Sequence, residues 1–156
     1  MVVGVADMSM AERMLSVLRN HAAEHVMVVH GEDGLDELST TGPSQVLELS
    51  GGKIQASTLD PTSLGVPTAR ADELVGGDPA TNAVYARKVL AGEPGPHRDI
   101  VVLNAGAALF VGGEVPSIAD GVVLAGQVLD DGRAAMALDR LVTTSQVEAS
   151  RGADPS

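Results

Sequence analysis

The first thirty residues alternate between short apolar runs and one amphipathic stretch. The run "VVGVA" at residues 2–6 suits a strand, and residues 26–29 are apolar at every position, as in a strand covered on both faces. Ser9 and Glu12 between them form a capping-box pattern that predicts a helix start. Apolar residues then recur at the spacing of one helical face: Ala11, Met14, Leu15, Leu18 and Ala22. The pattern predicts a parallel β-α-β unit with a right-handed crossover.

The middle of the chain predicts a hairpin and then a capped helix. The stretch "SQVLELSGGKIQASTL" at residues 44–59 alternates in polarity on either side of Gly51-Gly52, and glycines supply the positive φ of a tight turn. Asp78 followed by Pro79 is typical of a helix N-cap and first helical position. The buried stripe expected of that helix is Ala83, Ala86, Val89 and Leu90.

The last third predicts helices. Residues 98–113, "RDIVVLNAGAALFVGG", contain the strand-like "IVVL", but their length and helical periodicity favour a buried helix whose small residues allow close approach. Ser117 is expected to cap a second helix, and Gly132 to precede a third. Residues 147–156 are polar, and we expect a disordered tail there after a domain at residues 1–146.

Together these elements predict an α/β fold with strands in the first half and helices after them. Two parallel strands and a hairpin make a small sheet for so many helices, and the chain opens directly into a strand. We therefore expect further strands of the same sheet to belong to sequence outside this chain.

Composition limits the classes of function. Hydrophobic residues make up 44% of the 156, but only Tyr85 and Phe110 are aromatic, so an aliphatic core is expected. The net charge of −11 argues against nucleic-acid and anionic-membrane partners, which need clustered Lys and Arg. No Cys is present, no apolar run approaches the roughly 20 residues of a membrane span, and no signal peptide is visible. A cytoplasmic protein is the expectation.

The stretch "HGEDGLDE" at residues 30–37 places four carboxylates directly after the second strand. Ligands of open α/β sheets bind outside the carboxyl ends of parallel strands, and oxygen ligands on a loop suit Mg²⁺, which takes one or two carboxylates plus substrate phosphates. Adjacent Asp36 and Glu37 are candidates for that pair. The loop does not match a calcium-binding EF-hand register. A solvated turn at Asp33-Gly34 explains the same pattern, so the residues alone leave both interpretations open.

Three other motifs have a structural and a chemical interpretation. His30 suits a general base or a hydrogen-bonded strand end, and residues 39–41, "STT", suit a phosphate contact or a turn. Residues 76–78, "GGD", weakly resemble a phosphate-binding loop, but the helix cap already explains them. The structural interpretation is the commoner outcome for each.

Four segments taken together resemble anthranilate phosphoribosyltransferase. They are "VVGVAD", "HVMVVHGEDGLDELS", "ADELVGGDPATNAVYARKVLAGE" and "RDIVVLNAGAALFVGG", in this order, and the resemblance extends to about Gln146. It implies part of a nucleoside phosphorylase/phosphoribosyltransferase-like α/β domain, with a parallel β-α-β unit and a hairpin followed by helices. It also implies transfer of a phosphoribosyl group from phosphoribosyl pyrophosphate to anthranilate in tryptophan biosynthesis, usually by a homodimer. The Asp and Glu of the family's "GLDE" motif bind Mg²⁺, which points to Asp36 and Glu37.

The chain also departs from that family. The glycine-rich "GTGGD" loop, the "STN" phosphate contacts, the "GPLTNP" segment and the anthranilate-binding residues belong to the family's N-terminal half and are absent. The resemblance therefore implies a C-terminal portion that is inactive alone. Two alternatives remain: a relative of the pyrimidine nucleoside phosphorylases, or a non-catalytic half-protein that needs a complementary chain.

Overall fold

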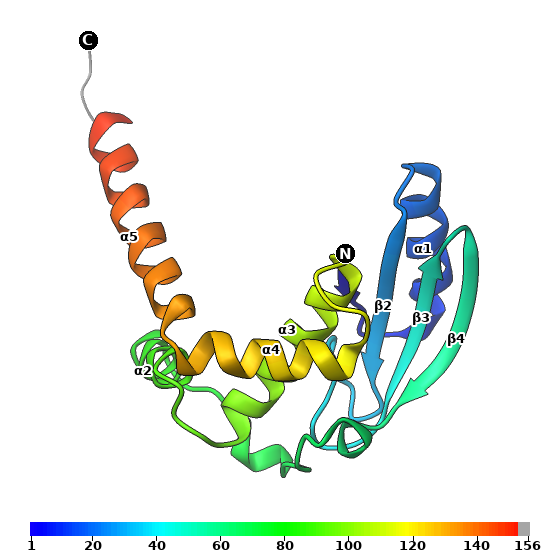
Figure 1. Ribbon diagram of the computed structural model, residues 1–156, viewed down its shortest axis with the longest axis horizontal. Helices are drawn as coiled ribbons and strands as arrows, with labels where there is room; N and C mark the ends of the chain where they lie inside the picture. The colour runs from blue at the N-terminus through cyan, green and yellow to red at the C-terminus, as the bar shows by residue number, and fades with distance from the viewer. Residues whose placement is uncertain (153–156) are drawn as a thin grey trace.

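The computed structural model describes residues 1–152, the last four of these by their backbone only. A four-stranded sheet comes first and four long helices follow it (Figure 1). The elements in chain order are β1 (Val2–Gly4), α1 (Ala11–Asn20), β2 (His25–Gly31), β3 (Ser44–Ser50), β4 (Lys53–Leu59), α2 (Pro79–Leu90), α3 (Pro96–Val111), α4 (Ile118–Asp130) and α5 (Arg133–Gly152). Short 3₁₀ turns lie at Met8–Met10, Pro61–Leu64 and Ala71–Glu73.

The sheet is mixed, with the strand order β1-β2-β3-β4. Strand β1 pairs with β2 in parallel, with Val3 opposite Val28, and β3 pairs antiparallel with both β2 and β4. Gly51 and Gly52 turn the β3–β4 hairpin with φ angles of 55° and 77°. The predicted β-α-β unit, its parallel pairing and the hairpin are therefore confirmed, as is the α/β fold class.

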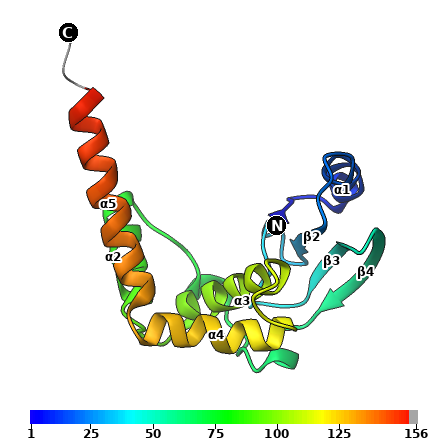
Figure 2. The same ribbon diagram turned by 45° about the horizontal axis from the view of Figure 1, so that its top comes forward.

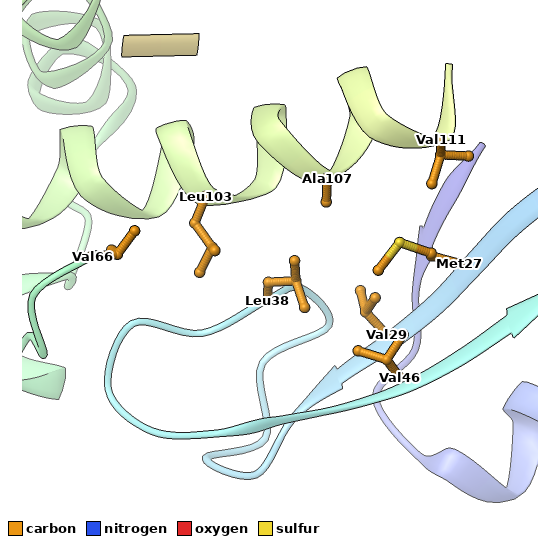
Figure 3. Close-up of a cluster of buried hydrophobic side chains, with 8 residues drawn as sticks. All are labelled: Met27, Val29, Leu38, Val46, Val66, Leu103, Ala107 and Val111. Atoms are coloured by element: carbon orange, nitrogen blue, oxygen red, sulfur yellow. The ribbon is translucent and has the colours of Figure 1, made fainter. Parts of the chain in front are cut away.

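Strand β2 is buried on both faces, as its apolar run predicts. Val26 and Val28 pack with residues of α1, whereas Met27 and Val29 face α3. Figure 3 shows the second cluster, in which side chains of α3 point towards the sheet. Its buried members are Met27, Val29, Leu38, Val46, Val66, Leu103, Ala107 and Val111. One helix on each face of the sheet thus holds the end of β2, from which the acidic loop leaves.

Residues 98–113 lie almost wholly in helix α3, so the helical interpretation of this ambiguous segment is confirmed. Helix α3 packs along α4 (Figures 1 and 2). The two backbones come close together at Gly106 and Gly121, where a Cβ added to Gly121 would lie 2.2 Å from the carbonyl oxygen of Gly106. Glycine at both positions makes this contact possible.

The predicted start of the first helix is wrong. Asp7, not Ser9, caps the chain here, because its carboxylate accepts the Ser9 N–H at 2.8 Å and opens a 3₁₀ turn. Helix α1 follows from Ala11 without a side-chain cap. Ala22, predicted on its apolar face, lies beyond its end with a φ of 58°.

Helices α2 and α4 begin as predicted, at the caps Asp78 and Ser117. The predicted stripe of α2 is only partly right, because Val89 is buried but Ala83 and Ala86 are exposed. The reason is that α2 packs on the rest of the chain mainly through its last turns, beside α3 and α5.

Helix α5 projects away from the rest of the molecule (Figure 2). It passes residue 146 without a break and ends at Gly152, so residues 147–152 of the predicted tail are helical. Residues 153–156 lie outside the described residues, and the domain boundary at residue 146 stays a prediction. In the part of the chain that the structure describes, no helix is both long and apolar enough to cross a bilayer.

Candidate functional site

The acidic loop leaves the carboxyl end of β2 as a tight turn. The Gly31 N–H donates to the Leu35 carbonyl at 2.8 Å, and the Gly34 N–H donates to the Gly31 carbonyl at 2.9 Å. Gly34 has a φ of 95°, a conformation that side chains other than glycine rarely adopt. The chain therefore turns at Asp33-Gly34, as the solvated-turn interpretation of this loop predicts.

Asp33 stabilises this turn from within. Its carboxylate accepts hydrogen bonds from the Ser39 hydroxyl at 2.5 Å, from the Thr41 hydroxyl, and from the Leu35 N–H at 3.1 Å. Partial burial opposes ionisation of Asp33, but these hydrogen bonds outweigh it and lower the pKa of the carboxyl. The hydroxyls of Ser39 and Thr41 are thus engaged by Asp33, which favours the turn interpretation of this segment.

Asp36 and Glu37 differ from Asp33 in their surroundings. Among the side chains that the structure describes, none donates a hydrogen bond to either carboxylate. Asp36 is exposed, whereas Glu37 is half-buried and lines a groove of about 450 Å³ between the loop, α2 and α3. Burial raises the pKa of Glu37, and the negative charges of Asp36 and Asp33 raise it further. A bound cation would relieve this crowding of like charges.

The donor set fits Mg²⁺ better than a closed structural metal site. Within residues 1–148, no three His, Cys, Asp or Glu side chains gather in a way that could hold a metal. The residues that this chain would contribute to such a site are the adjacent pair Asp36 and Glu37. Mg²⁺ accepts such a pair because it keeps several waters and binds substrate phosphates as well. The metal assignment itself stays a prediction.

Helix α3 also holds the loop, through a residue that the sequence analysis missed. The Asn104 side chain accepts the Leu38 N–H at 2.9 Å and donates to the Leu38 carbonyl at 2.8 Å. The available sequence signal was a single amide side chain in the otherwise apolar run "IVVLNAGAALFV". Nothing in that run indicates which segment the amide contacts.

Three of the four histidines have structural partners. The His30 Nδ1 atom lies 2.9 Å from the Val5 carbonyl oxygen, which ties β2 to the end of β1 and favours its structural interpretation. His25 Nε2 lies 2.7 Å from a carboxylate oxygen of Glu48. His97 stacks on Tyr85 with 4.5 Å between ring centroids. The partners of His25 and His97 come from distant strands or helices, and the sequence pattern does not reveal them.

A mixed sheet partly covered by helices, with an acidic loop at the end of a parallel strand, defines an α/β domain of the kind whose ligands bind beyond the strand ends. The profile of the family described as "Glycosyl transferase family, a/b domain" matches residues 1–135. The chain belongs to this glycosyl transferase family.

Two similar proteins of the family carry the same name. Anthranilate phosphoribosyltransferase of Paramagnetospirillum magneticum is 47% identical over 141 residues, which are 90% of this chain and 41% of the relative. The same enzyme of Rubrobacter xylanophilus is 44% identical over 97% of this chain and 45% of its own length. The chain thus spans less than half the length of these relatives.

Solved structures give the same picture of the fold. The crystal structure of anthranilate phosphoribosyltransferase from Thermus thermophilus superposes with a TM-score of 0.80 at 40% identity, covering 90% of this chain and 41% of that one. The Saccharomyces cerevisiae enzyme, solved in complex with PRPP and Mg, has a TM-score of 0.79 at 20% identity, over 88% of this chain and 40% of its own. The latter likeness is one of fold.

Proposed function

We propose that this chain is the C-terminal part of an anthranilate phosphoribosyltransferase. In the complete enzyme it serves transfer of a phosphoribosyl group from phosphoribosyl pyrophosphate to the amine of anthranilate, a step of tryptophan biosynthesis. The observation that carries the proposal is the acidic loop at the end of β2, within a chain 47% identical to an enzyme of that name. Among the described residues, no side chain donates a hydrogen bond to the carboxylate of Asp36 or Glu37.

Asp36 and Glu37 are the proposed Mg²⁺ ligands. When bound, Mg²⁺ offsets the negative charge that develops on the leaving pyrophosphate. Asp36 is exposed to solvent, whereas Glu37 lines the groove beside α2 and α3. Asp33 stabilises the turn by accepting hydrogen bonds from Ser39 and Thr41. Its carboxylate is therefore engaged within the fold, and Asp36 and Glu37 remain as the proposed metal ligands. Positioning and electrostatics are the chain's contribution to the reaction.

The other parts of the proposed active site lie outside this chain. The relatives carry more than half of their length beyond the matched region. Contacts to the ribose phosphate, the pyrophosphate and anthranilate are expected from that remainder, and the isolated chain is expected to be inactive. A cytoplasmic location and a homodimeric complete enzyme belong to the same proposal.

The metal site is tested by substituting its two carboxylates in the longer enzyme. Asp36→Asn combined with Glu37→Gln keeps the shape of both side chains but removes their charge. We expect the Mg²⁺ concentration needed for half-maximal formation of phosphoribosylanthranilate to rise by about tenfold or more. Glu32→Gln is the matched control, because Glu32 lies on the same loop and is exposed to solvent like Asp36, and it should leave the Mg²⁺ titration unchanged.

Three outcomes contradict parts of the proposal. A Mg²⁺ titration that is identical in the double variant and the unsubstituted enzyme returns the loop to a solvated turn. Turnover of a pyrimidine nucleoside with phosphate, without any turnover of anthranilate, moves the enzyme to the nucleoside phosphorylases. Activity of the 156-residue chain alone refutes the division of the site between two parts of the enzyme.

A further inference from the structure

Asn104 joins helix α3 to the acidic loop across 66 residues of sequence. Its side-chain oxygen accepts the Leu38 N–H at 2.9 Å, and its side-chain nitrogen donates to the Leu38 carbonyl at 2.8 Å. The same nitrogen donates to the Ile100 carbonyl at 3.0 Å, one turn back along the helix. One side-chain amide thus satisfies both main-chain polar groups of a single loop residue, as a neighbouring strand would.

The side chain of the same loop residue is fixed as well. Leu38 is 0% exposed and packs in the cluster that contains Leu103 and Ala107 of α3. Figure 3 shows its side chain between the sheet and these helical residues. Leu38 directly follows Glu37, so the chain leaves the carboxylate pair through a residue that α3 holds by both its backbone and its side chain.

Strand β1 supports the other side of the pair. A Cβ added to Gly4 would lie 1.5 Å from the carbonyl oxygen of Asp36, so the backbone at Asp36 rests directly on the backbone of β1. The two candidate ligands therefore stand between a contact to β1 at Asp36 and a contact to α3 at Leu38. Few main-chain torsions remain free between these two points.

Asparagine is a poor residue for a helix interior, because its short amide competes with the helical backbone. Its neighbours Leu103 and Ala105 are apolar, and a residue such as alanine or leucine at position 104 would have a higher helix propensity. The contact to Leu38 explains the amide at this position. Its geometry is that of a group which orients a ligand-bearing loop from behind.

We propose that Asn104 is a positioning residue for the metal-binding pair. By holding the backbone of Leu38 it fixes the direction in which Asp36 and Glu37 present their carboxylates. This role rests on the proposed function of that pair as Mg²⁺ ligands. Pre-ordering of the loop lowers the conformational entropy lost when the metal binds, so its loss weakens metal affinity even when the fold survives.

The test uses the 156-residue chain and two readouts that need no catalysis. Mn²⁺, a paramagnetic substitute for Mg²⁺, is titrated while broadening of the amide NMR signals of residues 35–38 is followed, which yields a dissociation constant. Amide hydrogen exchange of the same residues is measured without metal. Asn104→Ala should weaken Mn²⁺ binding by about tenfold and speed exchange at Leu38. Asn104→Gln, which retains the amide one methylene further out, should show a smaller effect in the same direction and serves if Asn104→Ala does not fold.

Val102→Ala is the matched control on the same helix. Val102 is buried but belongs to the cluster between α2, α3 and α4, away from the loop. It should lower the melting temperature while leaving Mn²⁺ affinity and exchange at Leu38 as in the unsubstituted chain. The proposal is overturned if Asn104→Ala leaves both readouts unchanged, or if Val102→Ala weakens Mn²⁺ binding equally. If the unsubstituted chain binds Mn²⁺ no better than the Asp36→Asn, Glu37→Gln variant, the pair does not bind the metal in this chain and the proposal is overturned. Faster exchange in Asn104→Ala then leaves Asn104 with a purely structural role, while the Mg²⁺ titration of the longer enzyme decides the metal site separately.

Discussion

Gly121→Ala tests the close contact between α3 and α4 that supports the helix carrying Asn104. The added methyl group would lie 2.2 Å from the carbonyl oxygen of Gly106 and 2.9 Å from its Cα. Ordinary contacts of this kind begin near 3.4 Å, so the two helices must separate by about 1 Å. The atoms in the way belong to the backbone and cannot move aside by a change of rotamer.

The size of the effect follows from two opposing contributions. Alanine in place of glycine in a helix interior stabilises the folded state by about 1 kcal/mol. Overpacking of a tight contact costs about 1–3 kcal/mol, and a clash with backbone lies at the upper end of that range. We therefore expect Gly121→Ala to lower the free energy of unfolding by roughly 2 kcal/mol.

Gly126→Ala on the same helix is the matched control. The Cβ added there meets only the end of the Arg98 side chain at 3.5 Å, an ordinary contact. Only the higher helix propensity of alanine over glycine then changes the stability, and it should stabilise the protein by up to about 1 kcal/mol. The two alanine variants should differ by about 3 kcal/mol, or roughly 6–12 °C in melting temperature for a chain of this size.

Thermal and urea unfolding followed by circular dichroism in the far ultraviolet measure the difference. Equal melting temperatures of the two variants would show that α3 and α4 do not meet backbone to backbone at Gly106 and Gly121. A more stable Gly121→Ala would lead to the same conclusion.

Two further predictions concern the core and a helix cap. Leu103→Ala removes a fully buried side chain and should lower the free energy of unfolding, measured in urea, by about 2–5 kcal/mol. Leu141 on α5 is 65% exposed, so Leu141→Ala should change this free energy by less than about 0.5 kcal/mol. Similar losses in both variants would contradict the assigned burial. The Thr81 N–H donates to the Asp78 carboxylate at 2.8 Å, and this hydrogen bond lowers the pKa of Asp78. The cap therefore stabilises the folded protein at pH values above the ordinary carboxyl pKa. This stabilisation is lost as the pH falls through the pKa that Asp78 has in the folded state. Asp78→Ala should therefore lower the melting temperature at about pH 7 but have little effect near about pH 2. Asp78→Asn should largely preserve the cap at both pH values. A loss of stability in Asp78→Ala that is independent of pH would argue against a charged cap at Asp78.

Much of the fold is encoded locally and could be predicted. The hairpin at Gly51-Gly52, the caps at Asp78 and Ser117, and the apolar run of β2 each depend on residues close together in sequence. Hydrogen bonds of turns and caps join residues only a few positions apart, and the pattern shows them directly. Where two local signals competed, as Asp7 did with Ser9, the prediction chose the wrong cap.

The candidate site was located by sequence but not explained by it. The carboxylates after β2 and their place at the end of a parallel strand follow from the pattern, whereas the choice of Asp36 and Glu37 over the solvated turn came from resemblance to a known family. The structure distinguishes the carboxylates by their hydrogen bonds, because Asp33 accepts hydrogen bonds from Ser39 and Thr41.

By itself the sequence determined the order of the elements, the parallel pairing and the position of the acidic loop. Only the tertiary structure decided that Asn104 holds Leu38, that Asp36 rests on Gly4, and that α3 and α4 touch at two glycines. The physical reason is that these contacts join segments far apart in the sequence. Each partner has an ordinary local pattern, and the geometry that brings them together arises only when the helices pack on the sheet.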